Sequence, residues 1–71
     1  MNWKELKLVK PGDILLLATQ HMYCTQTYEN STFTKIGIRA QPVEFVNGTM
    51  VVEGVGRWLT AYQMKLLKKV G

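Results

Sequence analysis

The segment VEFVNGTMVV, residues 43–52, places Asn47-Gly48 between two apolar runs. Asn-Gly is the strongest short-range signal for a β-hairpin, because a type I′ turn needs positive φ at both central residues. This turn sets the register, with residue 46 opposite 49, 45 opposite 50, 44 opposite 51 and 43 opposite 52. One face of the hairpin then carries four apolar residues that we predict belong to the core: Val43, Phe45, Met50 and Val52.

Segments on both sides of this hairpin carry the signals of further strands. A continuous apolar run after the Pro11-Gly12 turn is typical of a strand buried on both faces. Strict alternation of Ile36 and Ile38 with polar residues and glycine indicates a half-buried strand, which Gln41-Pro42 interrupts. The predicted strands outside the hairpin are residues 14–18, 35–39, 57–61 and 65–70.

The stretch from Thr19 to Thr34 is polar and rich in threonine. Alternation around Met22, Cys24 and Phe33 indicates extended structure, and Glu29-Asn30-Ser31 is the expected turn. We therefore interpret this stretch as a long irregular hairpin that follows the first strand.

The layout resembles an SH3-like barrel from residue 11 onward. Pro11-Gly12-Asp13 leads into the first strand, the polar stretch takes the place of the RT loop, and Tyr62-Gln63-Met64 resembles the 3₁₀ turn before the final strand. The resemblance implies an all-β fold: a small five-stranded SH3-like barrel, forming a single domain over residues 1–71. A short helical turn is expected at the N-terminus, where Asn2 and Glu5 are spaced as in a capping box.

Composition excludes several classes of protein. The chain has 71 residues, of which 46% are hydrophobic and 20% charged, with a formal net charge of +4 and one cysteine. No apolar run approaches the roughly 18 to 20 residues that span a bilayer, and a single cysteine cannot form an internal disulfide. We expect a cytoplasmic protein with no membrane partner. Because one core of this size supplies only about 3 to 5 kcal/mol, a homo-oligomer is among the expected states.

No set of residues carries a catalytic or metal-binding signature. His21 and Cys24 are spaced as half of a zinc site, but the chain has no further His or Cys to complete the four ligands. Glu44 and Glu53 lie near each other on the predicted hairpin, without a motif that marks them for acid-base chemistry. We therefore expect no enzyme activity and no cofactor.

Aromatic residues near a basic side chain are the preferred candidates for a binding surface. Trp, Tyr and Arg are the residue types that dominate the binding energy of protein interfaces. The candidates are Tyr23, Tyr28, Arg57 and Trp58. A core of this size also needs aromatic side chains, so the alternative for Trp58 is a place in the core. The expected function is a non-catalytic binding module, a bacterial or phage accessory protein that modulates or inhibits a host protein complex.

The alternative is a nucleic-acid-binding barrel, although a protein partner is favoured. In an SH3-like barrel the two termini are neighbours, so lysines from both ends would form one basic patch. Lysine supplies charge but reads bases less well than arginine, which argues against sequence-specific recognition. The residues of this patch are Lys4, Lys7, Lys10, Lys65, Lys68 and Lys69.

Overall fold

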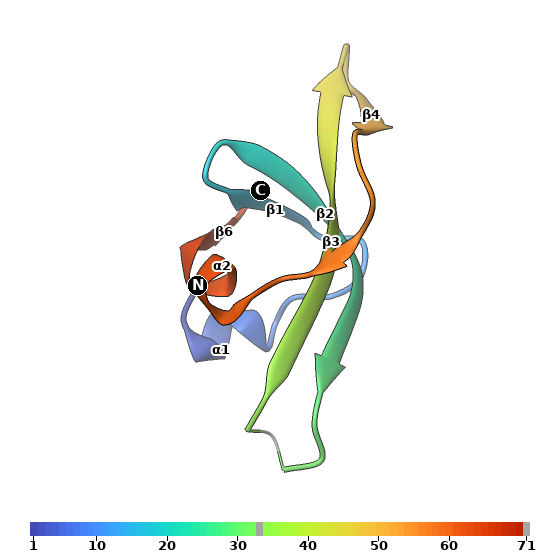
Figure 1. Cartoon of the computed structure of the whole chain (residues 1–71). Helices are drawn as coiled ribbons and strands as arrows, with labels where there is room; N and C mark the ends of the chain where they lie inside the picture. Colours follow the sequence, from blue (N-terminus) through green and yellow to red (C-terminus); the bar gives the residue numbers. More distant parts are fainter. Residues whose placement is uncertain (33, 71) are drawn as a thin grey trace.

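The chain folds into an antiparallel sheet with two short helices (Figure 1), and the computed structural model describes residues 1–32 and 34–70. Phe33, which alternation predicts in extended structure, lies outside the described residues. The elements in chain order are α1 (Trp3–Leu6), β1 (Ile14–Leu17), β2 (Gln20–Glu29), β3 (Ile36–Val46), β4 (Thr49–Val52), β5 (Arg57–Trp58), α2 (Ala61–Leu66) and β6 (Leu67–Lys69).

The predicted all-β class is confirmed, but the closed five-stranded barrel is wrong. The sheet has six strands in the order β4-β3-β2-β1-β6, with β5 paired to β3 beside β4. The sheet stays open because β3 is 11 residues long and its second half, together with β4, extends beyond the other strands. Figure 1 shows this hairpin projecting from one end of the molecule, whose principal extents are 42 × 19 × 18 Å.

The first two strands are joined by a tight turn and not by the predicted long loop. β1 ends at Leu17, and Ala18 and Thr19 lead directly into β2. Ala18 has a φ of 55°, the positive value that a two-residue hairpin turn requires. The polar stretch therefore forms one strand of 10 residues, with a bulge between Cys24 and Gln26. It ends at Glu29, where the sequence predicts the turn.

Both helices begin at a capping box, one predicted and one not. The Asn2 side chain accepts from Glu5 N at 2.8 Å, and Asn2 N donates to Glu5 Oε1 at 3.1 Å, which confirms the N-terminal helical turn. Thr60 and Gln63 make the same reciprocal pair at the start of α2. The segment before the last strand is consequently a six-residue α-helix, not a 3₁₀ turn, and it shortens that strand to β6.

The register predicted for the Asn47-Gly48 hairpin is confirmed, and Val43 is buried as predicted, but the other three residues of the predicted core face, Phe45, Met50 and Val52, are exposed. The core uses the even positions of β3, namely Ile36, Ile38 and Ala40, and no bulge in β3 changes this alternation. Odd positions therefore lie on the outer face. Val43 is buried there at 1% exposure, whereas Phe45 is 44% exposed and packs edge-to-face with the His21 ring, at 5.5 Å between centroids.

The core lies between the inner face of the sheet and the helices. It collects apolar side chains from α1, β1, β2, β3 and β6 and from the segments between elements, and it contains no buried polar side chain among the described residues. The long hairpin of β3 and β4 contributes nothing beyond Ala40 to this cluster. Its buried members are Leu6, Val9, Leu15, Met22, Cys24, Ile36, Ile38, Ala40, Leu59 and Leu67.

Truncating one residue on each face of β3 tests this assignment. We expect Ile38→Ala to destabilise the fold by about 2 to 5 kcal/mol, because Ile38 is fully buried. Phe45→Ala should cost about 1 kcal/mol or less, because nearly half of the side chain is already in water. Urea unfolding followed by circular dichroism measures both. An equal loss of stability in the two variants would show that the outer face of the hairpin belongs to the core.

Candidate binding groove

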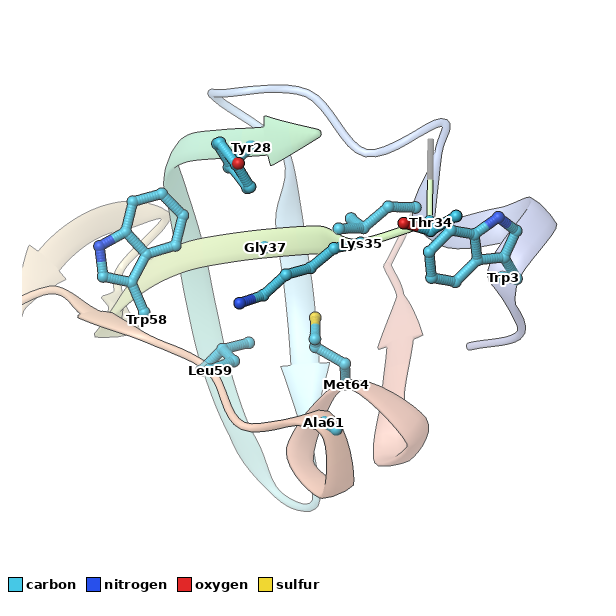
Figure 2. A pocket seen from close by; sticks show the side chains of 10 residues that line it. Trp3, Tyr28, Thr34, Lys35, Gly37, Trp58, Leu59, Ala61 and Met64 are labelled. Atoms are coloured by element: carbon cyan, nitrogen blue, oxygen red, sulfur yellow. The ribbon is translucent and has the colours of Figure 1, made fainter. Parts of the chain in front are cut away.

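A groove of about 630 Å³ runs along the edge of β3 where the strand begins. Its walls come from segments far apart in the sequence: α1, the end of β2, the start of β3, β5 and α2 (Figure 2). Most of its lining is aromatic or apolar. The residues are Trp3, Tyr28, Thr34, Lys35, Ile36, Gly37, Trp58, Leu59, Ala61 and Met64.

Two aromatic side chains form one wall because a glycine lies between them. Tyr28 is opposite Gly37 in the β2–β3 register, and Trp58 is opposite Arg39 in the β3–β5 register. All of these residues therefore lie on the outer face of the sheet. A Cβ atom at Gly37 would stand 3.2 Å from Trp58 Cζ3 and 3.5 Å from Tyr28 Cβ. The missing side chain is what lets the Trp58 ring lie against the strand, next to Tyr28.

The opposite wall comes from the two helices. The capping box places Trp3 in the first turn of α1, and Thr60 starts the helix that presents Met64. Lys7 Nζ lies 6.0 Å from the Trp3 ring centroid, and it also forms an ion pair of 3.8 Å with Glu29 at the end of β2. This contact joins α1 to the sheet beside the groove.

The floor of the groove contains a stretch of β3 edge that β5 does not cover. Leu59 N donates to Ile38 O at 2.8 Å, so the main-chain groups of Ile38 point toward β5. Asn30 N donates to Lys35 O at 3.1 Å, so the main-chain groups of Lys35 point toward β2. Because the hydrogen-bonding direction alternates along a strand, the N–H and C=O groups of Ile36 point into the groove. β5 pairs only with Arg39 and Ala40 and leaves this position open.

The groove is positively charged. Lys35 is the one charged side chain among its described lining residues, and no carboxylate faces it. Figure 2 shows Lys35 crossing the middle of the groove, with Trp58 on one side and Trp3 on the other. A ligand that contacts both aromatic walls must therefore pass this ammonium group.

The structure brings together two of the four predicted binding residues. Tyr28 and Trp58 share the groove, and both are half-exposed, at 50% and 51%. Tyr23 lies on the outer face of β2 opposite Gln41, outside the groove. Arg57, opposite Ala40 on the other face of β5, lines a neighbouring hollow that it shares with Val55 and with Trp58. Trp3, Lys35 and Gly37 also line the groove but are not among the predicted residues.

The predicted lysine patch forms only in part. The Met1 amino group donates to Lys65 O at 3.0 Å and to Leu67 O at 2.8 Å, so the chain start does lie against α2 and β6. Lys65, Lys68 and Lys69 line a hollow there together with Glu5. Lys4, Lys7 and Lys10 do not line it, and Lys7 is held toward Glu29 instead.

The candidate reactive groups are a buried thiol and a pair of neighbouring carboxyl groups. Cys24 is fully buried, and its Sγ donates to Gln26 O at 3.6 Å. Burial, reinforced by the negative charge of Asp13, raises the pKa of the Cys24 thiol, which therefore stays protonated near neutral pH. On the hairpin, Glu44 and Glu53 are neighbours, as predicted, and the hydrogen bond and charge of Glu53 raise the pKa of Glu44.

The described residues contain neither a metal-binding cluster nor a membrane-spanning helix. Residues 1–32 and 34–70 contain no group of three or more His, Cys, Asp or Glu side chains placed to hold a metal ion. No helix in this part of the chain is long and apolar enough to cross a membrane.

Comparison with known proteins adds no relative. No family model, no curated protein and no solved structure matches this chain.

Adding a side chain at position 37 tests how Trp58 is held. Gly37→Val should displace the Trp58 ring and leave the sheet intact, because valine suits a strand but its Cβ would crowd the indole. The measurement is the position of the two indole N–H signals in a ¹H–¹⁵N NMR spectrum. Gly56→Ala is the control, because a Cβ there meets its nearest neighbour at 3.4 Å. An unmoved Trp58 signal in Gly37→Val would contradict the proposed role of Gly37.

Proposed function

We propose that this chain is a non-catalytic binding module whose groove takes an extended segment of a partner protein. The observation that carries the proposal is the half-exposed aromatic wall of Trp58 and Tyr28, with Trp3 facing it across the groove. A small protein with a limited core leaves such side chains in water at a cost in stability. Binding a partner accounts for their exposure, because aromatic side chains dominate the energetics of protein interfaces.

The shape and charge of the groove support a particular kind of segment. The open edge of β3 at Ile36 offers one N–H and one C=O to the partner segment. That segment would pair with β3 as an added strand, next to the end of β5. Lys35 and the lack of lining carboxylates favour a segment that carries an acidic residue. An extended segment with an aromatic or aliphatic anchor next to Asp or Glu fits both features.

The lining of the groove suggests how binding would act. A module that binds through an apolar and aromatic groove affects its target by occupying a surface. We propose that it modulates or inhibits the protein complex to which the segment belongs, as small bacterial and phage accessory proteins do. Inhibition follows directly if the segment has a second partner that needs the same residues.

Removing the aromatic wall should weaken binding without unfolding the protein. We expect Trp58→Ala to reduce affinity about 30-fold or more, the loss typical of an interface hot spot. The change in stability should be about 1 kcal/mol or less, because half of the ring is exposed. Tyr62→Ala is the matched control, since Tyr62 is 70% exposed and does not line the groove.

The measurement is affinity capture from nuclease-treated bacterial lysate, followed by titration of the captured protein. Support requires a stoichiometric protein that binds the wild type and Tyr62→Ala equally and binds Trp58→Ala weakly. Its binding segment should also shift the amide signals of Ile36 and Gly37 in an NMR titration. A captured protein that is insensitive to Trp58→Ala and Lys35→Glu would show that the groove is not the site. Unfolding of Trp58→Ala by circular dichroism would show that Trp58 belongs to the core.

One observation favours a second candidate function, binding of nucleic acid. Three lysines of the predicted patch do gather in the hollow beside the chain start: Lys65, Lys68 and Lys69. Phosphate contacts of this kind give an affinity that falls with salt. For each neutralised phosphate, the logarithm of the binding constant falls by about 0.7 to 0.9 for every tenfold increase in salt concentration. Glu5, on the same hollow, opposes such binding.

Salt dependence tests the second candidate. If the three lysines each contact a phosphate of a single-stranded oligo(dT), the logarithmic salt slope should be about −2 to −3. Lys68→Gln combined with Lys69→Gln should reduce the slope to about −1. Fluorescence anisotropy from 50 to 300 mM NaCl measures it. A flat response, or no binding at 50 mM salt, removes nucleic acid as a partner.

A further inference from the structure

The two ends of the sheet are protected very differently. At one end, the Met1 amino group donates to Leu67 O at 2.8 Å, and β6 carries the exposed Lys68 and Lys69. Covering an edge strand and placing lysines on it are two ways in which proteins prevent edges from pairing. At the other end, β4 reads Thr49-Met50-Val51-Val52, which contains no charge, proline or glycine. All four of its residues are exposed.

The outer edge of β4 presents a complete set of pairing groups. Glu53 N donates to Pro42 O at 2.9 Å, which makes residues 53 and 42 a hydrogen-bonded position of the β3–β4 ladder. The alternation of an antiparallel ladder then directs the main chain of Val51 and Thr49 toward β3. The N–H and C=O groups of Met50 and Val52 point away from β3. Among the described residues, β4 is the last strand of the sheet, and β3 is its one partner.

We propose that this edge pairs with β4 of a second copy of the chain. An antiparallel pair centred on Val51 sets Met50 of each copy opposite Val52 of the other. Both residues direct their main-chain groups outward, so this register forms four N–H···O=C hydrogen bonds. Val51 then faces Val51 of the second copy across a two-fold axis, as an isologous contact requires. The joined hairpins form a four-stranded segment, β3-β4-β4-β3, inside one continuous sheet.

The charges of the hairpin are compatible with this arrangement. Glu53 falls opposite Thr49 of the second copy, so no two carboxylates face each other directly across the new pair. The two Glu44 residues are separated by three strand spacings, about 14 Å. The exposed apolar side chains give the association its driving force, because Met50 and Val52 of each copy contact one another on the same face as Phe45.

The size of the contact predicts a reversible dimer. A standard interface covers about 800 Å² of each partner, which is about one sixth of the 5002 Å² surface of this chain. A pair of four-residue strands covers less than this, so we expect association in the micromolar range. The contact leaves the groove free, because the groove lies at residues 34–37 of β3 and the hairpin occupies the other end.

The test is sedimentation velocity of the whole chain from 5 to 500 μM. The wild type should shift from monomer to dimer over this range. Val51→Lys should remain a monomer, because it sets two ammonium groups opposite each other on the two-fold axis. Val55→Lys is the charge-matched control: Val55 is 72% exposed and lies outside β4, so this variant should still dimerise. Circular dichroism confirms that each variant is folded.

Cross-linking locates the axis. In a non-hydrogen-bonded pair the Cα atoms are about 4.5 Å apart, within the range that a disulfide bridges. Val51→Cys should therefore form a covalent dimer under copper–phenanthroline oxidation in air, whereas Val55→Cys should not. The native Cys24 is buried and does not compete.

A wild type that remains monomeric at 500 μM overturns the proposal and leaves the β4 edge to a strand of a different protein. A dimer that survives Val51→Lys, or that forms without a Val51→Cys cross-link, also overturns it, by placing the contact elsewhere. Capture of a partner through the groove is unaffected by either result, because none of these variants changes a residue that lines it.

Discussion

The pairing of β3 with three other strands is the constraint on which the whole structure depends. Its length lets it bind β2 on one side along most of its course, and β5 and then β4 on the other. Even positions of the strand build the core, and odd positions build the outer face. A shift of one residue in this ladder would bury Gly37 and Arg39 and expose Ile36 and Ile38. The groove, the hairpin and the core are therefore fixed together.

Local signals in the sequence predicted the parts of the fold that depend on a few neighbouring residues. The Asn47-Gly48 turn predicted the hairpin register, because positive φ at two central positions is a local requirement. The capping pair of Asn2 and Glu5 predicted the first helix for the same reason. Of the predicted core face of the hairpin, Val43 is buried and Phe45, Met50 and Val52 are not, because their burial depends on how far β3 extends past its neighbours. That length is decided by the pairing with β2, which no short segment encodes.

The groove shows the same division between local and long-range information. Tyr28 and Trp58 could be named because their residue types are typical of interfaces. Trp3 could not, because its place depends on how α1 meets the sheet through Lys7 and the core residue Leu6. Gly37 did leave a signal: a glycine inside an alternating strand often marks a close approach of another group. The approaching group, Trp58, lies 21 positions further along the chain, so sequence could not identify it.

The contact between Gly37 and Trp58 has a consequence for how this protein can diverge. An aromatic residue at position 28 can be exchanged for another flat or apolar one while the wall of the groove keeps its shape. Any side chain at position 37 moves the indole, so selection acts to keep position 37 without a Cβ atom. Homologues that keep the groove are expected to keep the glycine more strictly than the tyrosine. The hallmark of the family would then be a small residue between two buried isoleucines, with a tryptophan on a distant short strand.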